Sequence, residues 1–205
     1  MGIYEDRVLP RIIDLSCGSR MLDPVRVRTC AGLSGRVVEI GFGSGRNVPF
    51  YPAEVTSVSA VEPADNGWRM AARRVAASPI PVERAGLDGQ SLPFEDDSFD
   101  SALSTWTLCT IPDVMAALAE VRRVLVPGGV FHFVEHGLAP DASVRKWQHR
   151  CNPLQRTLFG GCNLNRDIGA LIDEAGFEMR TLDRFYEKPT PKTLGALSLG
   201  VAVSH

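Results

Sequence analysis

Glycine occupies alternate positions in one loop of this chain, at Gly41, Gly43 and Gly45, directly after the expected strand 36–40. Glycine reaches backbone conformations that other residues avoid, and its missing side chain lets a ligand approach the main chain. In a parallel sheet covered by helices, such a loop lies at the carboxyl end of a strand, where ligands bind. The loop therefore predicts a ligand-binding turn between a strand and a helix. A tight turn without a ligand is the alternative.

The spacing of the glycines and the acids that follow them narrow the choice of ligand. The dinucleotide motif Gly-x-Gly-x-x-Gly would need a glycine at position 46, which is Arg46 here. Glu62 ends the next apolar run and can accept hydrogen bonds from two ribose hydroxyls. Asp88 follows the third run and can accept one from an adenine amino group, while Gly89 leaves room for the ring. A solvated turn is the alternative for Asp88.

Short β-branched runs alternate with helical patterns, which is typical of βαβ units and a mostly parallel sheet. The first five strands are expected at 36–40, 55–62, 82–85, 99–105 and 130–135. Between the last two, Asp113 can cap a helix with apolar residues at 114, 118, 121 and 125, closed by Gly128. A second helix follows Asn165 and stops at Gly176. The runs 177–185 and 194–203 then predict an antiparallel pair.

Composition fits one soluble domain, because 205 residues with 44% hydrophobic and 22% charged side chains suit a single globular unit. We expect residues 1–34 to form N-terminal helices that cover the site, and 137–164 to be an insertion that shapes the acceptor site. The net charge of −2 argues against nucleic acid as a main partner. No apolar run approaches the roughly 20 residues of a membrane span, and the N-terminus lacks a secretion-signal pattern, so a cytoplasmic location is expected.

The five cysteines predict reduced thiols. They are odd in number and widely spaced, so neither a disulfide framework nor a metal-binding Cys-x-x-Cys pair is indicated, and no metal site is expected. They are Cys17, Cys30, Cys109, Cys151 and Cys162.

Several motifs in order resemble the class I methyltransferases of the type 11 group. They are Glu-x-Gly-x-Gly-x-Gly from Glu39, the acid Glu62, Leu-Pro-Phe-x-x-x-Ser-Phe-Asp from Leu92, and Arg-Arg-Val-Leu-x-Pro-Gly-Gly from Arg122. The resemblance covers about 37–134. It implies a Rossmann-like α/β fold with a seven-stranded sheet, the last strand antiparallel and helices on both faces. It also implies S-adenosylmethionine as the cofactor. The residues expected to bind it are Glu39, Gly41, Gly43, Gly45, Asn47, Glu62, Pro63, Asp88, Gly89, Ser104 and Thr105.

A narrower resemblance points to the methyltransferase-like thiol S-methyltransferases, whose acceptors are small alkyl thiols and hydrogen sulfide. It rests on the segments 41–47, 50–52, 107–111, 133–136, 147–148 and 161–166. Animal members carry an apolar N-terminal anchor, and a membrane span is not expected here. An acidic residue usual before Gly-Cys-Asn-Leu is replaced by Gly160-Gly161, which weakens the transfer of substrate choice through that loop.

The acceptor side is expected to use Trp106, Cys109, Trp147 and Cys162. His136, at the end of the fifth strand, is the histidine placed to accept a proton, and a hydrogen bond to the loop after it is the alternative role. An apolar lid is expected from Met21, Leu22, Trp147, Leu158 and Phe159, for which a core position is equally open. A small apolar acceptor is expected, and the resemblance implies a thiol as the first candidate. A quinone or phenol, a phospholipid amine, and a cofactor-binding protein without catalysis are the alternatives.

Overall fold

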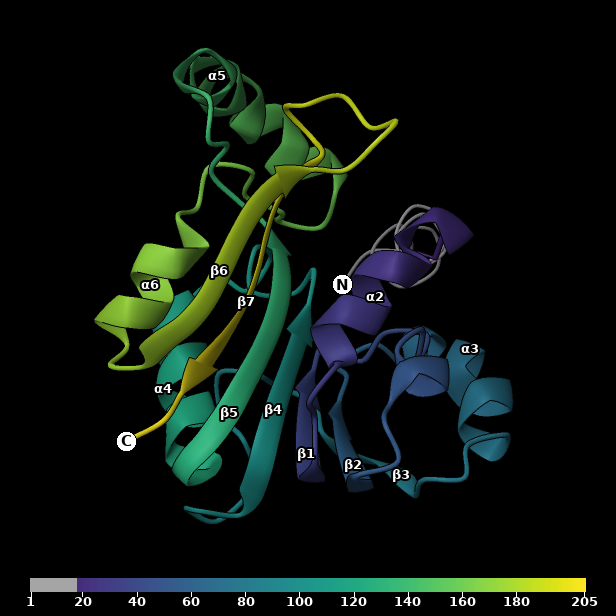
Figure 1. Cartoon of the computed structure of the whole chain (residues 1–205). Helices are drawn as coiled ribbons and strands as arrows, with labels where there is room; N and C mark the ends of the chain where they lie inside the picture. The colour runs from purple at the N-terminus through teal and green to yellow at the C-terminus, as the bar shows by residue number, and fades with distance from the viewer. Residues whose placement is uncertain (1–17) are drawn as a thin grey trace.

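A single seven-stranded sheet organises the molecule, in a computed structural model that describes residues 18–205 (Figure 1). The strand order is β3-β2-β1-β4-β5-β7-β6, and β7 runs antiparallel to both of its neighbours. The strands are β1 Gly35–Ile40, β2 Val55–Val61, β3 Val82–Gly86, β4 Phe99–Thr105, β5 Leu125–His136, β6 Glu178–Tyr186 and β7 Ala196–Val203. The expected Rossmann-like sheet with its antiparallel last strand is confirmed.

Helices cover both faces of this sheet, as expected (Figure 1). On one face, Val38 and Ile40 of β1 pack with Leu118 in one core cluster. On the other face, Val37 packs with Cys30. The helices are α2 Asp23–Cys30, α3 Asp65–Ala76, α4 Val114–Val124, α5 Ala142–Leu158 and α6 Ile168–Glu174, with short 3-10 turns η2 Arg20–Leu22 and η3 Val48–Phe50. The last four residues of β1 are all buried, as expected for a strand covered on both faces.

Helix α4 begins where the sequence predicts and ends earlier. The side chain of Asp113 accepts a hydrogen bond from the backbone N–H of Ala116 at 3.0 Å, so the predicted N-cap is confirmed. The prediction that Leu125 belongs to the helix is wrong, because its extended backbone already pairs with Phe99 at the start of β5. Gly128, at a φ of +81°, therefore lies within β5 and does not close the helix.

The prediction of a helix directly after the glycine loop is also wrong. Only the three-residue turn η3 follows the loop before β2 begins. Pro49 lies inside this turn, and Pro52 follows Tyr51, whose backbone is extended. Proline disfavours helical backbone in the residue before it and cannot donate a hydrogen bond, so the chain cannot build further helical turns here.

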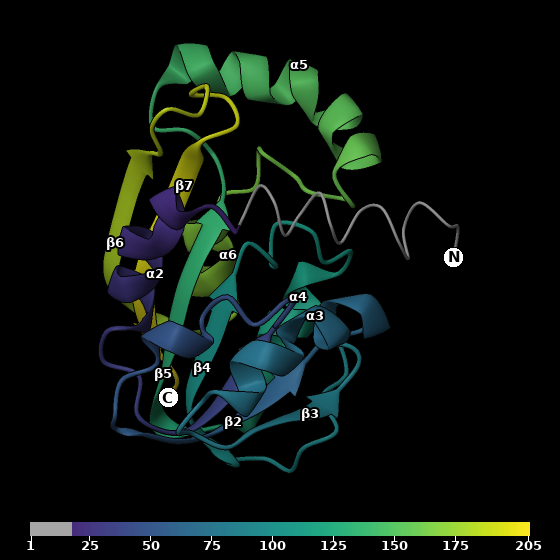
Figure 2. The same cartoon turned by 90° about the vertical axis from the view of Figure 1, so that its right-hand side faces the viewer.

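The segment 137–164 forms α5 and the loop that returns from it, beyond the carboxyl ends of β4 and β5 (Figures 1 and 2). Gln148 anchors the helix, because its side chain accepts from Ala139 N at 2.9 Å and donates to Gly137 O at 3.0 Å. Of the N-terminal segment 1–34, residues 1–17 lie outside the described part, and the rest forms η2, α2 and the turn into β1. Within residues 18–205 we find no helix whose length and apolarity would let it cross a bilayer.

Candidate active site

A cavity of about 650 Å³ lies at the carboxyl ends of four neighbouring strands. Because β3, β2, β1 and β4 are adjacent in the sheet, the loops after them meet along one edge. Small-molecule sites typically occupy about 300–1,000 Å³ at this place in an α/β sheet. The expected cofactor residues found in its lining are Gly41, Gly43, Asn47, Glu62, Pro63, Asp88, Gly89 and Thr105.

The three glycines of the first loop serve different purposes, although all have positive φ. A Cβ at Gly41 would overlap the side chain of Thr107, and one at Gly45 would lie 3.1 Å from Ala71. A Cβ at Gly43 would meet no atom closer than 3.9 Å, although Gly43 lines the cavity. Gly43 therefore keeps space open for a ligand. Gly41 and Gly45 permit close packing, and Gly45 lies behind the cavity wall.

Glu62 follows β2 and points its carboxylate into the glycine loop. It is buried, with Oε2 accepting from Gly43 N at 2.6 Å and Oε1 accepting from Ala64 N at 2.8 Å. Burial raises the pKa of Glu62, while these two backbone N–H groups act in the opposite direction. The carboxylate thus stays in one place, beside the open space at Gly43.

The part of the cavity next to the end of β3 is lined by a polar side chain and by apolar ones. Asp88 is exposed, and its Oδ1 accepts from the backbone and side-chain N–H groups of Gln90. A Cβ at Gly89 would lie 2.8 Å from Ile40 and 3.4 Å from Ile111, both of which line the cavity. Glycine at position 89 therefore lets the loop pack closely against two apolar residues of the cavity lining.

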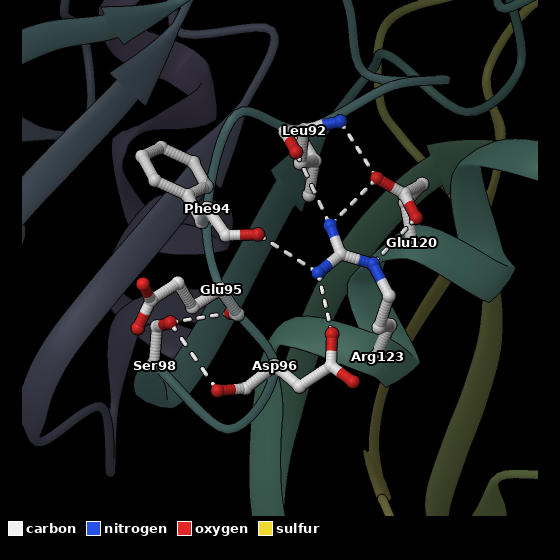
Figure 3. A network of polar contacts seen from close by, with 7 residues as sticks. All are labelled: Leu92, Phe94, Glu95, Asp96, Ser98, Glu120 and Arg123. Atoms are coloured by element: carbon white, nitrogen blue, oxygen red, sulfur yellow. Dashed lines mark hydrogen bonds and ion pairs between the residues drawn. The ribbon is translucent and has the colours of Figure 1, made fainter.

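The loop after β3 is held in place by Arg123 of α4 (Figure 3). The guanidinium donates to the carbonyl oxygens of Phe94 at 2.8 Å and Leu92 at 3.1 Å, and to Asp96 at 2.8 Å. Glu120 accepts from the same guanidinium and from Leu92 N at 2.7 Å. The Leu-Pro-Phe and Arg-Arg-Val-Leu motifs therefore belong to one clamp behind the Asp88 loop.

Glu39 and Ser104 lie outside the cavity lining, whereas Asn47 is part of it. Asn47 donates to Glu39 at 2.9 Å and to Oγ1 of Thr105 at 3.0 Å, and Tyr51 donates to the other oxygen of Glu39. Burial raises the pKa of Glu39 to about 7, despite the hydrogen bonds from Tyr51 and Asn47. Glu39 is therefore a structural support for Asn47, and the expectation that it contacts the ligand itself is not supported by its position outside the lining.

Arg26 is a cavity residue that the sequence reasoning missed. It is buried, lines the cavity as Arg46 does, and donates to Oδ1 of Asn47. Its guanidinium also lies 4.7 Å from the ring centroid of Trp106. Helical spacing could have indicated it, because Arg26 lies on the same face of α2 as the buried Thr29 and Cys30. Two arginines give the β1–β4 part of the cavity a positive character.

Trp106 is the acceptor-side residue that the structure places in the cavity lining. It follows β4 at a φ of +53°, a conformation that is rare for a bulky side chain. Its backbone N–H donates to the carbonyl oxygen of Val134 at 2.8 Å, which holds the strained residue against the neighbouring strand β5.

Glu135 organises the chain that leaves β4. It is fully buried and accepts hydrogen bonds from Ser104 Oγ at 2.8 Å, Thr107 N at 3.0 Å and Cys109 N at 3.1 Å. Burial raises the pKa of this carboxyl. Ser104 thus contributes through Glu135 and lies outside the lining.

Cys109, His136 and Cys162 come together beside the cavity. Sγ of Cys109 and Sγ of Cys162 are 3.6 Å apart, and Nδ1 of His136 is 3.9 Å from the first and 3.7 Å from the second. The neighbouring thiol of Cys109 and then His136 lower the pKa of Cys162 to about 5, whereas the pKa of Cys109 is raised. Sequence spacing could not indicate this cluster, because each member comes from a different segment.

None of the residues expected to form an apolar lid is part of the cavity lining. Trp147 is 56% exposed on α5, outside the cavity lining, with Arg150 over its ring, so its expected acceptor contact is a correction. Its helix turns this side chain outward, because Gln148 takes the buried position next to it. Leu22 is buried, and Met21, Leu158 and Phe159 are exposed outside the lining.

The sheet order, the glycine turn and the acid after β2 define a nucleoside-binding Rossmann-like enzyme of the methyltransferase class. The methyltransferase domain family matches residues 38–133. Human thiol S-methyltransferase TMT1A is 34% identical over 72% of this chain and 62% of its own length. Phosphatidylethanolamine N-methyltransferase of Cereibacter sphaeroides is 31% identical over 66% of this chain and 70% of its own.

A solved S-adenosylmethionine-dependent methyltransferase from Thermotoga maritima shares the fold, with a TM-score of 0.69, 22% identity, and coverage of 95% of this chain and 94% of that one. The chain belongs to the S-adenosylmethionine-dependent methyltransferases, and S-adenosylmethionine is the cofactor of this family. It spans less than two thirds of the length of TMT1A.

Proposed function

We propose that this chain transfers a methyl group from S-adenosylmethionine to a small thiol. The observation that carries the cofactor assignment is the open space at Gly43, with the Glu62 carboxylate fixed beside it in a cavity of suitable volume. The thiol assignment is supported by the 34% identity to a thiol S-methyltransferase.

The lining fits each part of the cofactor. Glu62 would accept from the ribose hydroxyls, and Asp88 from the adenine amino group, with Ile40 and Ile111 as apolar lining for the base. Arg26 would balance the charge of the amino-acid carboxylate at the β1–β4 part of the cavity. When bound, the cofactor supplies an electrophilic methyl group on a sulfonium ion.

The protein's own task is then positioning and exclusion of water. A thiol needs little further help, because a pKa near 8.5 leaves a few per cent thiolate at neutral pH. Trp106 and Ile111 give the cavity an apolar wall for a small acceptor. The similarity to a phosphatidylethanolamine N-methyltransferase keeps an amine as the second candidate.

A competition among acceptors tests the proposal. S-adenosylmethionine labelled at the methyl group is offered with equal concentrations of an alkyl thiol, a quinol, a phenol and a phospholipid amine. We expect label chiefly in the thioether. Label chiefly in a quinol, phenol or amine product would contradict the thiol assignment, and binding of the cofactor without any transfer would indicate a non-catalytic cofactor-binding protein.

A further inference from the structure

Cys109, His136 and Cys162 form a compact set of soft ligands that methyl transfer as described above does not use. Among residues 18–205 they form a group of three ligand-type side chains whose donor atoms all lie within 4.8 Å of one another. Cys109 and Cys162 are buried and His136 is partly exposed. The group is therefore closed on the sulfur side and accessible from the histidine side.

The spacing of the three atoms matches a tetrahedral zinc site. Zinc–sulfur bonds of about 2.3 Å and zinc–nitrogen bonds of about 2.0–2.1 Å place two sulfurs about 3.8 Å apart, and a sulfur and a nitrogen about 3.6 Å apart. The distances here are 3.6 Å between the sulfurs and 3.7 and 3.9 Å from sulfur to Nδ1. Two thiolates and an imidazole are also the donors zinc prefers.

We propose that Cys109, His136 and Cys162 bind a zinc ion whose fourth coordination position takes the acceptor thiol as its thiolate. The use of that position rests on the proposed function, whereas the metal site rests on the geometry alone. Zinc sites with three protein ligands and one open position are those that bind and activate small molecules.

The three ligands are held before any ion binds. Cys109 is fixed by the hydrogen bond from its N–H to Glu135 and by its carbonyl oxygen, which accepts from Asn163 N at 2.8 Å and from the Asn163 side chain at 3.1 Å. The loop of Cys162 is thereby bound directly to the loop of Cys109. His136 ends β5, next to Glu135. A site fixed in this way needs little rearrangement on binding, which favours affinity.

The turn at Gly160 and Gly161 makes the approach of the two loops possible. Both glycines have positive φ, of +59° and +87°, and a Cβ at Gly161 would lie 3.2 Å from the carbonyl oxygen of Thr110. A larger residue at position 161 would therefore press on the Cys109 loop.

The charge around the cluster suits a bound thiolate. Zinc with two cysteine thiolates is neutral, and a third thiolate makes the site anionic. Arg166 is the cation beside the cluster, since its guanidinium donates to Leu108 O and interacts electrostatically with both cysteines and with the neighbouring acid Glu135. A third sulfur ligand would therefore be stabilised by a charge already in place.

Chain neighbours of both cysteines line the cofactor cavity. Thr107 and Thr110, which flank Cys109 along the chain, line the cavity, and so does Gly160, two residues before Cys162. Binding of a thiol to a zinc-bound hydroxide releases water: the thiol proton joins the hydroxide, and the sulfur takes the vacated position. The exchange balances in atoms and charge and needs no separate general base.

Cobalt substitution tests the site directly. The protein is purified with a chelator, transferred to a thiol-free reductant, and titrated with Co²⁺. Absorption spectra follow two signals, the visible bands of tetrahedral cobalt and the thiolate-to-cobalt charge-transfer band. We expect both bands, their loss when Zn²⁺ is added, and a stronger charge-transfer band when an alkyl thiol is added as a further ligand.

Two variants locate the ion. Cys162→Ser and His136→Gln should weaken Co²⁺ binding by about 100-fold or more, since even residues that only support metal ligands cost about 10–100-fold. Cys151→Ser, on α5 outside the cluster, is the matched control and should bind as the parent does. Melting followed by circular dichroism shows that each variant is folded.

The outcomes separate this proposal from the proposed function. Cobalt bands that persist in both cluster variants, or a Cys109–Cys162 disulfide with no cobalt bands in the reduced parent, would overturn the metal site. Thiol methylation at full rate by metal-free protein would overturn the role of the fourth position in binding the acceptor, while leaving the methyltransferase proposal intact. Cobalt bands unchanged by added thiol would overturn the thiol position.

Discussion

At the scale of single residues, Gly43 distinguishes a ligand site from a tight turn. It combines a φ of +56° with open space toward the cavity, whereas Gly41 and Gly45 are closely packed. Gly43→Val should abolish binding of S-adenosylmethionine, because the new side chain would occupy the cofactor's approach. Isothermal calorimetry measures the loss.

Gly128 provides the matched control. It also has positive φ, of +81°, and a Cβ added there would have no atom within 4 Å, but it lies near the start of β5, away from the cavity. Gly128→Val should carry a similar backbone strain of about 1–2 kcal/mol and bind the cofactor normally. Equal loss of binding in both variants would show that strain, and not ligand approach, explains the effect.

The burial of the Glu39 carboxyl makes the free energy of unfolding depend on pH. Burial raises its pKa to about 7 from 4.5. Well below pH 4.5 the group is protonated in both the folded and the unfolded state. As pH rises from there through 7, the unfolded chain ionises first, so the free energy of unfolding falls, on the order of 3 kcal/mol.

Glu39→Gln should remove this part of the pH dependence while keeping a side chain that can bond Asn47 and Tyr51. Urea unfolding at pH 5 and pH 8 measures it: the parent should lose more stability than the variant over this interval. An equal loss in both proteins would show that Glu39 ionises in the folded state as it does in the unfolded chain.

At the scale of secondary-structure elements, α4 supports the cavity through Arg123 (Figure 3). Arg123→Met leaves the carbonyl oxygens of Leu92 and Phe94 without this donor, which should cost about 1–3 kcal/mol. The melting temperature should then fall by several degrees, and cofactor affinity should fall a few-fold because the Asp88 loop loosens. Arg122→Met, one residue away with a side-chain hydrogen bond to His205 O, is the control. An equal effect of both variants would contradict the clamp.

The sequence predicts elements well where one local pattern decides them. The apolar runs of β1 and β4, the cap at Asp113 and the stop at Gly176 are local and are confirmed. The end of α4 was missed because Leu125 continues the helical spacing, while its pairing with Phe99 in the sheet decides its conformation. Pairing of that kind depends on a distant segment.

At the scale of the whole molecule, the cofactor side of the site could be predicted and the acceptor side could not. Glu62 and Gly43 follow strand ends, so their meeting follows from the sheet order. Cys109, His136 and Cys162 meet only because the loop after α5 folds back onto the chain after β4. Trp147 was misplaced for the same reason, since the orientation of α5 depends on where Gln148 is anchored.

The central claim is that this cavity transfers a methyl group to sulfur. The most direct measurement incubates the protein with S-adenosylmethionine carrying a deuterated methyl group and an alkyl thiol, and identifies the product by mass spectrometry. The account predicts the deuterated methyl thioether with the parent protein and none above background with Gly43→Val. No thioether from the parent, or equal amounts from the parent and Gly43→Val, would contradict it.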